Sequence, residues 1–345
     1  MKKVKERDAK FGTAIKNSIV DFFYGINVFL HNKIFSKLKR KDFASNTKSR
    51  RNELIFIACV LVFPLTVFCV FYIGVNFNSI LLAFQDYNYE TFKYEWVGIN
   101  QFKEFFKTVR TEPFMSYSLK NSFSLLGLTL LINLPFQVLN AYYVYKKKLM
   151  HKFFKVILFL PSVLSNVVMV TIFKYFVDYG VKDLYRLLDL GTAPQLISGL
   201  DNGFKMILLF TFWSSFGGNI ILFVGVMTRI PATVVEAAEI DGITPVKEFF
   251  YITLPLVFPT IVVYIISAIS TFFTNQGSLY AFYGVNARTE HYTFGYYYFT
   301  QVLGEAGVGK YPMVAAAGLI FTLIIAPITL ILRRIMTKLF PAVEF

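Results

Sequence analysis

The sequence predicts an all-α integral membrane protein with six transmembrane helices, and three observations support this prediction. Hydrophobic residues make up 55% of the 345 residues and the mean hydropathy is +0.53, which is more apolar surface than one soluble core needs. Six apolar stretches reach the length of about 20 residues that a helix needs to cross a bilayer. Lysine and arginine gather beside these stretches, so the net charge of +14 marks membrane flanks and no nucleic-acid partner is expected.

The predicted spans follow one another along the chain, and the segments between them differ in charge. Cytoplasmic loops of membrane proteins carry an excess of lysine and arginine. The arm before the first span holds 14 of the 35 basic residues, and the segments 146–155 and 332–339 are also basic. Both termini are therefore expected in the cytoplasm. The six predicted spans are residues 54–84, 122–145, 156–176, 206–228, 256–273 and 313–332.

Three parts of the chain follow from this topology. Residues 1–53 form a basic cytoplasmic arm, residues 54–339 the membrane domain, and residues 340–345 a short tail. Within the arm, residues 18–35 are apolar but too often interrupted to span a bilayer. We expect an amphipathic helix there that contacts membrane lipid headgroups; a disordered tail is the alternative.

A polar segment at residues 231–255 interrupts the apolar second half of the chain. The predicted topology places it in the cytoplasm, yet it carries four acidic groups where basic residues would favour the membrane surface. We therefore expect this segment to contact a partner other than lipid. The alternative is an ordinary solvated pair of connecting helices, which accounts for the glycine and prolines but not for the acidic face.

The local sequence of this segment predicts two short helices joined by a glycine turn. Pro231 suits the first turn of a helix over residues 232–240, which are good helix formers. Gly242 ends that helix. A second helix starts at Pro245 and is expected to run until Pro255.

These residues resemble the EAA loop of permease subunits in binding-protein-dependent ABC importers. In that family the loop forms a coupling helix that docks into a cleft on the cytoplasmic ATPase. The stretches WVGINQF at 96–102 and YPMVAAAGLIF at 311–321 also resemble sugar-type permeases, so the resemblance covers most of the chain. The residues to which we assign coupling are Glu236, Ala237, Ala238, Asp241, Gly242, Leu254 and Pro255.

The resemblance implies a fold, a location and a set of partners. The fold is that of a type I ABC importer permease in the bacterial cytoplasmic membrane. The implied partners are a second homologous permease, two ATPase subunits and a solute-binding protein that docks on the external loops 85–119 and 274–312. ATP and magnesium belong to the ATPase, and no cofactor is expected on this chain. The implied substrate is an oligosaccharide; the alternative is another small polar solute, such as a peptide or an amino acid.

Uncharged polar and aromatic side chains near the polar segment are the candidates for the substrate path. Sugars offer hydroxyls for hydrogen bonds and apolar ring faces for stacking. The family's sugar-contacting stretch aligns with residues 268–275, although this chain departs from its aromatic and asparagine pattern. Each candidate could instead make a hydrogen bond between helices. The candidates are Trp213, Ser214, Asn219, Ser270, Thr271 and Asn275.

Catalytic and metal sites find no support in the sequence. The stretch GEAGVGKY at 304–311 nearly matches a phosphate-binding loop, but Tyr311 stands where a serine or threonine is needed. The three histidines lie far apart and lack metal-ligand spacing. Cys59 and Cys69, ten residues apart in the first span, are expected to be small packing residues. We therefore predict that the chain is not an enzyme.

Overall fold

The computed structural model describes residues 47–197, 202–303 and 307–339. Within these ranges the regular secondary structure is helical apart from one two-stranded hairpin. It divides into two compact units, Met1–Gly74 and Val75–Phe345. The predicted amphipathic helix at 18–35 and the tail at 340–345 lie outside the described residues.

The first unit contributes an apolar helix with no buried side chains. It consists of α3 (Thr47–Val67) and the π-helical segment η2 (Phe68–Gly74), and every side chain described in them is exposed. Cys59 and Cys69 are free and exposed along it. Neither is buried within this unit, so their expected role as packing residues stays a prediction. An apolar helix this long that is exposed on all sides needs lipid or another protein around it.

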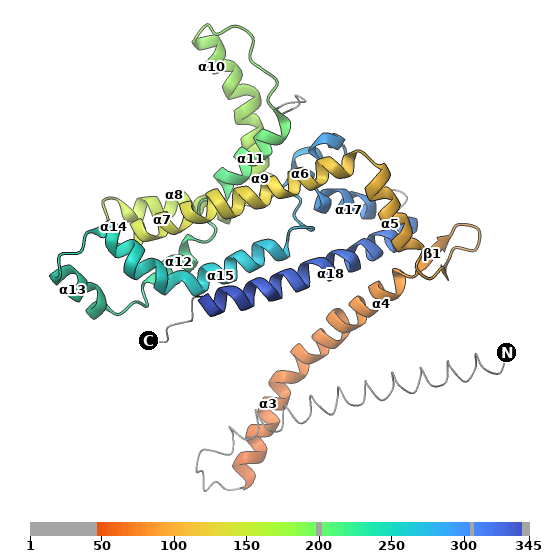
Figure 1. The fold of residues 1–345 in the computed structure, drawn as a ribbon, viewed down its shortest axis with the longest axis horizontal. Coiled ribbons are helices and arrows are strands. Elements are labelled where there is room, and N and C mark those ends of the chain that lie inside the picture. The colour runs from red at the N-terminus through yellow and green to blue at the C-terminus, as the bar shows by residue number, and fades with distance from the viewer. Residues whose placement is uncertain (1–46, 198–201, 304–306, 340–345) are drawn as a thin grey trace. The chain divides into compact units, whose positions relative to one another are not determined.

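In the described part of the chain, four helical stretches are long and apolar enough to cross a membrane, and they match the first, second, fifth and sixth predicted spans. The first joins α3 and η2 to α4 (Val75–Leu82), and the second comprises α6 (Phe114–Gly127), η3 (Leu128–Asn133) and α7 (Leu134–Tyr145). Within the second unit, α15 (Leu254–Ser270) and α18 (Gly307–Leu339) lie side by side (Figure 1). The four stretches are Asn52–Leu82, Phe114–Tyr145, Pro245–Ser270 and Gly307–Leu339.

The predicted third span is not one continuous helix. The chain forms α8 (His151–Val163) and then α9 (Asn166–Tyr175), which η4 (Phe176–Gly180) and α10 (Val181–Leu187) prolong; the two halves are bent by 104°. The break has a local cause, because Ser165 adopts an extended conformation and its hydroxyl accepts a hydrogen bond from the Val168 N–H at 3.4 Å. This is an N-cap that starts a new helix.

The predicted fourth span is interrupted as well. It comprises α11 (Gly203–Ser214) and α12 (Ile220–Met227), separated by a turn that contains Gly217 and Gly218. Adjacent glycines favour a break in a helix. Gly217 also lies against the backbone of α8, where a β-carbon would overlap the Leu158 carbonyl. The turn therefore both interrupts the helix and allows close packing against α8.

Short elements form the rest of the second unit, including a hairpin that the all-α prediction missed. Strands β1 (Gln85–Asn88) and β2 (Lys93–Trp96) pair antiparallel, with Gln85 opposite Trp96. At the tip the Asn88 side-chain oxygen accepts hydrogen bonds from the N–H groups of Glu90 and Thr91, which close the turn. The remaining helices outside the polar segment are α5 (Asn100–Thr111), α16 (Leu279–Tyr283), η6 (Thr289–His291), α17 (Phe294–Leu303) and α18 (Gly307–Leu339).

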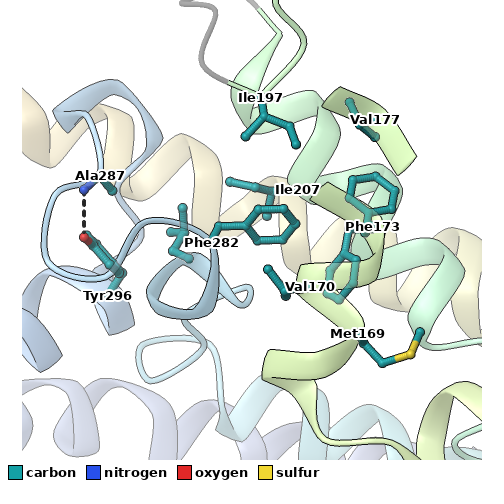
Figure 2. Packing of buried hydrophobic residues seen from close by; sticks show 11 residues of the cluster. Met169, Val170, Phe173, Val177, Ile197, Ile207, Phe282, Ala287 and Tyr296 are labelled. Carbon is teal, nitrogen blue, oxygen red and sulfur yellow. Dashed lines mark hydrogen bonds between the residues drawn. The ribbon is translucent and has the colours of Figure 1, made fainter. Parts of the chain in front are cut away.

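Three apolar clusters hold the second unit together. One joins α9, α11 and α16, with Phe173, Phe210 and Phe282 in edge-to-face contact. Figure 2 shows this cluster and the adjoining hydrogen bond of 3.0 Å from the Ala287 N–H to the Tyr296 hydroxyl. The second cluster joins α5, α6, α17 and α18, and the third joins α7, α12, η5 (Phe249–Thr253) and α15. These clusters position the polar segment and the polar side chains described next.

Candidate functional site

The polar segment at 231–255 begins with the helix that the sequence predicts. Helix α13 spans Ala232–Ile240, and Pro231 precedes it as the N-cap rather than lying in its first turn. At the other end Gly242 has φ +74°, and the Ile243 N–H donates to the Ala238 carbonyl at 3.1 Å. With the 3.0 Å bond from Gly242 N–H to the Glu239 carbonyl this is a Schellman motif, which terminates a helix sharply.

The second helix of the segment does not end at Pro255, so the predicted boundary is wrong. It starts as α14 (Pro245–Glu248) and continues through η5 into α15 (Leu254–Ser270) as one helix, Pro245–Ser270. Pro255 has no N–H to donate, and the chain adapts with a π-helical turn in which the Leu254 N–H donates to the Phe249 carbonyl. The polar segment is therefore continuous with the fifth predicted span.

The side chains of helix α13 are exposed or half-buried. None of them is buried, and Ile240 is 86% exposed. Glu236 and Ala237 are exposed and Ala238 is half-buried. Small residues beside exposed acids leave room for another surface to approach closely. In Figure 1 α13 lies at the edge of the second unit.

A lysine at the end of the second span holds the segment electrostatically. Lys146 Nζ lies 2.9 Å from Glu248 Oε2 and 3.4 Å from Glu239 Oε1. Burial by itself would lower the pKa of Lys146, but the hydrogen bond to Glu248 and the charge of that carboxylate outweigh burial, and the pKa is raised. The lysine therefore stays charged at any physiological pH.

The six candidate substrate residues fall in two regions, around the turn between α11 and α12 and at the end of α15. Trp213 stacks on Phe173 at the margin of the first apolar cluster, with Ser214 next to it on α11. Asn219 donates to the Gln137 side chain at 3.2 Å. Thus no single pocket brings all six together.

The other candidates lie at the end of α15. Thr271 and Asn275 line a small cavity of about 30 Å³ with Ser122 and Thr129 of the second span, and Ser270 is exposed beside it. The Asn275 Oδ1 accepts a hydrogen bond from the Gly277 N–H at 2.9 Å, which shapes a local turn. This place alone combines several candidates around a cavity.

A polar stripe on the second span was missed by the sequence analysis. Its members recur every three, four or seven residues, which is the spacing of one helix face. Gln137 is 1% exposed and its Nε2 donates to the Ser215 carbonyl at 2.6 Å. That periodicity was visible in the sequence. The stripe consists of Ser118, Ser122, Thr129, Asn133, Gln137 and Asn140.

The glycine-rich stretch at 304–311 has a packing role in its described part. A β-carbon on Gly309 would overlap the Tyr89 side chain of the β1–β2 hairpin. The Tyr94 hydroxyl also donates to the Val308 carbonyl at 3.1 Å. Gly309 therefore allows the hairpin to approach α18. Among the described residues no group of three or more histidine, cysteine or carboxylate side chains is arranged to hold a metal ion.

Comparison with known proteins settles the family. Residues 129–345 match the sequence profile of binding-protein-dependent transport system inner membrane components. The chain belongs to this family. The matched region contains the polar segment and the cavity-lining residues Thr129, Thr271 and Asn275. The family is one of transport components, not of enzymes.

Several curated relatives are sugar transport permeases. The chain is 28% identical over 227 residues to the multiple sugar-binding transport system permease protein MsmF of Streptococcus mutans, covering 65% of this chain and 76% of MsmF. It is also 28% identical over 243 residues to the arabinooligosaccharides transport system permease protein AraP of Bacillus subtilis, covering 68% of this chain and 74% of AraP.

A solved structure shares the fold. A chain of a bacterial ABC transporter involved in the import of the acidic polysaccharide alginate superposes with a TM-score of 0.68 at 19% identity, covering 85% of this chain and 99% of that chain. The prediction of a helical permease fold of this type is confirmed at this level. The count of six spans stays a prediction, since the described helices allow four to six.

Proposed function

We propose that this chain is a transmembrane permease subunit of an ATP-driven importer that moves an oligosaccharide into the bacterial cytoplasm. The observation that carries the proposal is the segment 231–255, a solvent-exposed helix with a Schellman turn that continues directly into a membrane-length helix. The sugar class rests on the relatives, which include permeases named for multiple sugars and arabinooligosaccharides. They favour a sugar over a peptide or an amino acid.

The exposed face of α13 is the proposed contact with the ATPase. Ala237 and Ala238 permit close packing there, and Glu236 and Asp241 supply charge at either side. Leu254 and Pro255 lie where the segment enters α15, so that a push on α13 reaches a membrane helix through the short turn at 241–244. ATP and magnesium belong to the partner subunit in this proposal.

The proposed substrate path follows the polar end of α15. Ser267, Ser270, Thr271 and Thr274 are exposed there, although the rest of the helix is strongly apolar. The Thr271 hydroxyl donates to the Ala268 carbonyl at 3.0 Å, which leaves its oxygen to accept a hydrogen bond from a sugar hydroxyl. A second, homologous permease would face this side and complete the path.

The external partner is a solute-binding protein. A related transporter structure is a complex with an alginate pentasaccharide-bound periplasmic protein, which supports a partner of this kind. The proposed docking regions are residues 85–119, which include the β1–β2 hairpin, and residues 274–312. Phe92 at the hairpin tip is 77% exposed and offers an apolar contact. Both chain termini lie in the cytoplasm in this arrangement.

Copurification tests the proposal. The tagged chain, purified from native membranes in mild detergent, should bring down an ATPase and a second permease identifiable by mass spectrometry. The binding protein encoded with them should retain oligosaccharides in a glycan-array screen. An assembly that lacks an ATPase, or a binding protein that retains peptides or amino acids instead of glycans, would contradict the corresponding part of the proposal.

A further inference from the structure

We infer that Lys146 is a positioning residue that makes the coupling helix α13 and the second span move as one body. The inference rests on the proposed function, since α13 is taken there as the ATPase contact. It concerns a side chain outside the segment 231–255. Lys146 lies at the C-terminal end of α7, and its ammonium group contacts acids from both helices of the segment.

The first contact is a buried anchor. The Lys146 side chain is 15% exposed and the Glu248 side chain 3% exposed, with 2.9 Å between their charged groups. Each charge also suits its helix, because lysine lies at the C-terminal end of α7 and Glu248 in the first turn of α14, where the helix dipoles favour those signs. Two neighbouring contacts strengthen the anchor: the Tyr142 hydroxyl donates to the Pro245 carbonyl at 2.9 Å, and the Tyr142 ring lies 4.9 Å from that of Phe249.

The second contact is an exposed arm. Glu239 is on α13, 60% exposed and 3.4 Å from Lys146 Nζ. Among the described residues it makes the only ion pair of α13. No side chain of α13 is buried, so apolar packing contributes little to its orientation. Apart from its two chain connections, the Lys146–Glu239 contact is therefore what holds α13 to the second span.

The two contacts of Lys146 differ in burial and therefore in strength. The pair with Glu248 is shielded from water and keeps α7 against α14 throughout, since removing one partner leaves a buried charge without compensation. The pair with Glu239 is more exposed and is therefore the weaker of the two, and it adds the link to α13. A displacement of α13 by the ATPase is thus passed to the second span and its polar stripe as well as along the chain into α15.

Distance measurements between spin labels test the inference in the assembled complex, with Cys59 and Cys69 replaced by serine. One label pair, Leu149 and Thr233, reports the distance between the end of the second span and α13. The other, Leu149 and Leu339, reports movement of the second span relative to α18. All three positions are exposed, and none lies in the assigned coupling set. The probe is the non-hydrolysable ATP analogue AMP-PNP with magnesium, so the identity of the sugar is not needed.

In the native sequence the Leu149–Thr233 distance should keep one narrow distribution with and without AMP-PNP, whereas the Leu149–Leu339 distance should shift. Lys146→Met should broaden the first distribution and reduce the shift by half or more, and Lys146→Arg, which keeps the charge and the donors, should restore both. Glu239→Gln, which removes only the contact with α13, should broaden the first distribution and reduce the shift to a smaller extent. Asp183→Asn, which removes one charge from an exposed pair on α10, should change neither.

Native distributions and shifts in Lys146→Met would overturn the inference. If that variant does not assemble, an unchanged Leu149–Thr233 distribution in Glu239→Gln would overturn it equally. Failure of the proposed function looks different: the native complex would then contain no ATPase and show no shift with AMP-PNP.

Discussion

Replacing Gly242 by alanine tests the coupling segment with the smallest possible change. The glycine has φ +74°, and a β-carbon there would meet no atom within 4 Å. The substitution therefore adds backbone strain without a steric clash. A left-handed conformation costs a residue with a β-carbon about 1–2 kcal/mol.

That cost is large for a turn with few other contacts. A penalty of about 1–2 kcal/mol corresponds to a factor of about 5–30 in the population of the native turn relative to a rearranged one. Since α13 has no buried side chain to resist rearrangement, the turn should yield and α13 should lose its fixed orientation. Insertion of the permease should be unaffected, because the apolar clusters lie elsewhere. We expect ATPase retention and uptake to fall by about fivefold or more at matched permease levels.

Gly191→Ala is the matched control. Gly191 also has a positive φ, +80°, and a β-carbon on it would likewise meet no atom within 4 Å, but it lies outside the coupling segment. ATPase copurification and sugar-stimulated ATP turnover are measured for both variants in the same membranes. Equal and native values in the two variants would refute the reasoning. Gly242→Asp and Ala238→Glu, which add charge or bulk on the same face, should abolish transport altogether.

Three further predictions concern other parts of the chain. Gly217→Ala should lower the Tm of the purified permease, since the new methyl group meets the backbone of α8 at a cost of about 1–3 kcal/mol. Gly218→Ala should leave the Tm unchanged, because a β-carbon there has no atom closer than 4.0 Å. Equal Tm values for the two variants would contradict the packing of that turn. Thr271→Val should leave assembly intact and weaken uptake at subsaturating sugar, because its hydroxyl bonds only within its own helix, and unchanged uptake would remove Thr271 from the path. Single cysteines at Glu239 and Gly98 should react with impermeant thiol reagents only from the cytoplasm and only from outside, respectively, and labelling of position 239 from outside would overturn the topology.

The membrane helices could be predicted where apolar sequence runs without interruption, as in Asn52–Leu82 and Gly307–Leu339. The bends at Ser165 and Gly217 could not, because average hydropathy does not register a helix break. Their signals were nonetheless local and readable: a serine N-cap in one case and adjacent glycines in the other. The β1–β2 hairpin was missed for a similar reason. Its alternating aromatic and polar residues have a low average hydropathy, which indicates only a loop.

The candidate site divides in the same way. The helix Ala232–Ile240 and the turn at Gly242 follow from short-range rules of helix termination, and the sequence predicts both. The second helix passes through Pro255 because a π-helical turn accommodates the missing N–H, which no simple rule anticipates. The Lys146 contacts join residues far apart in the chain, and only the packed structure brings them together.

Sugar-stimulated ATP turnover by the purified complex tests the central claim most directly. The complex is isolated through a tag on this chain, reconstituted in liposomes with its binding protein, and supplied with the glycan that the screen identifies. We predict that the glycan-loaded binding protein stimulates ATP hydrolysis and drives glycan into the vesicles, and that Gly242→Ala suppresses both. An ATP hydrolysis rate that does not change when the loaded binding protein is added would contradict the claim, as would a complex that lacks the ATPase.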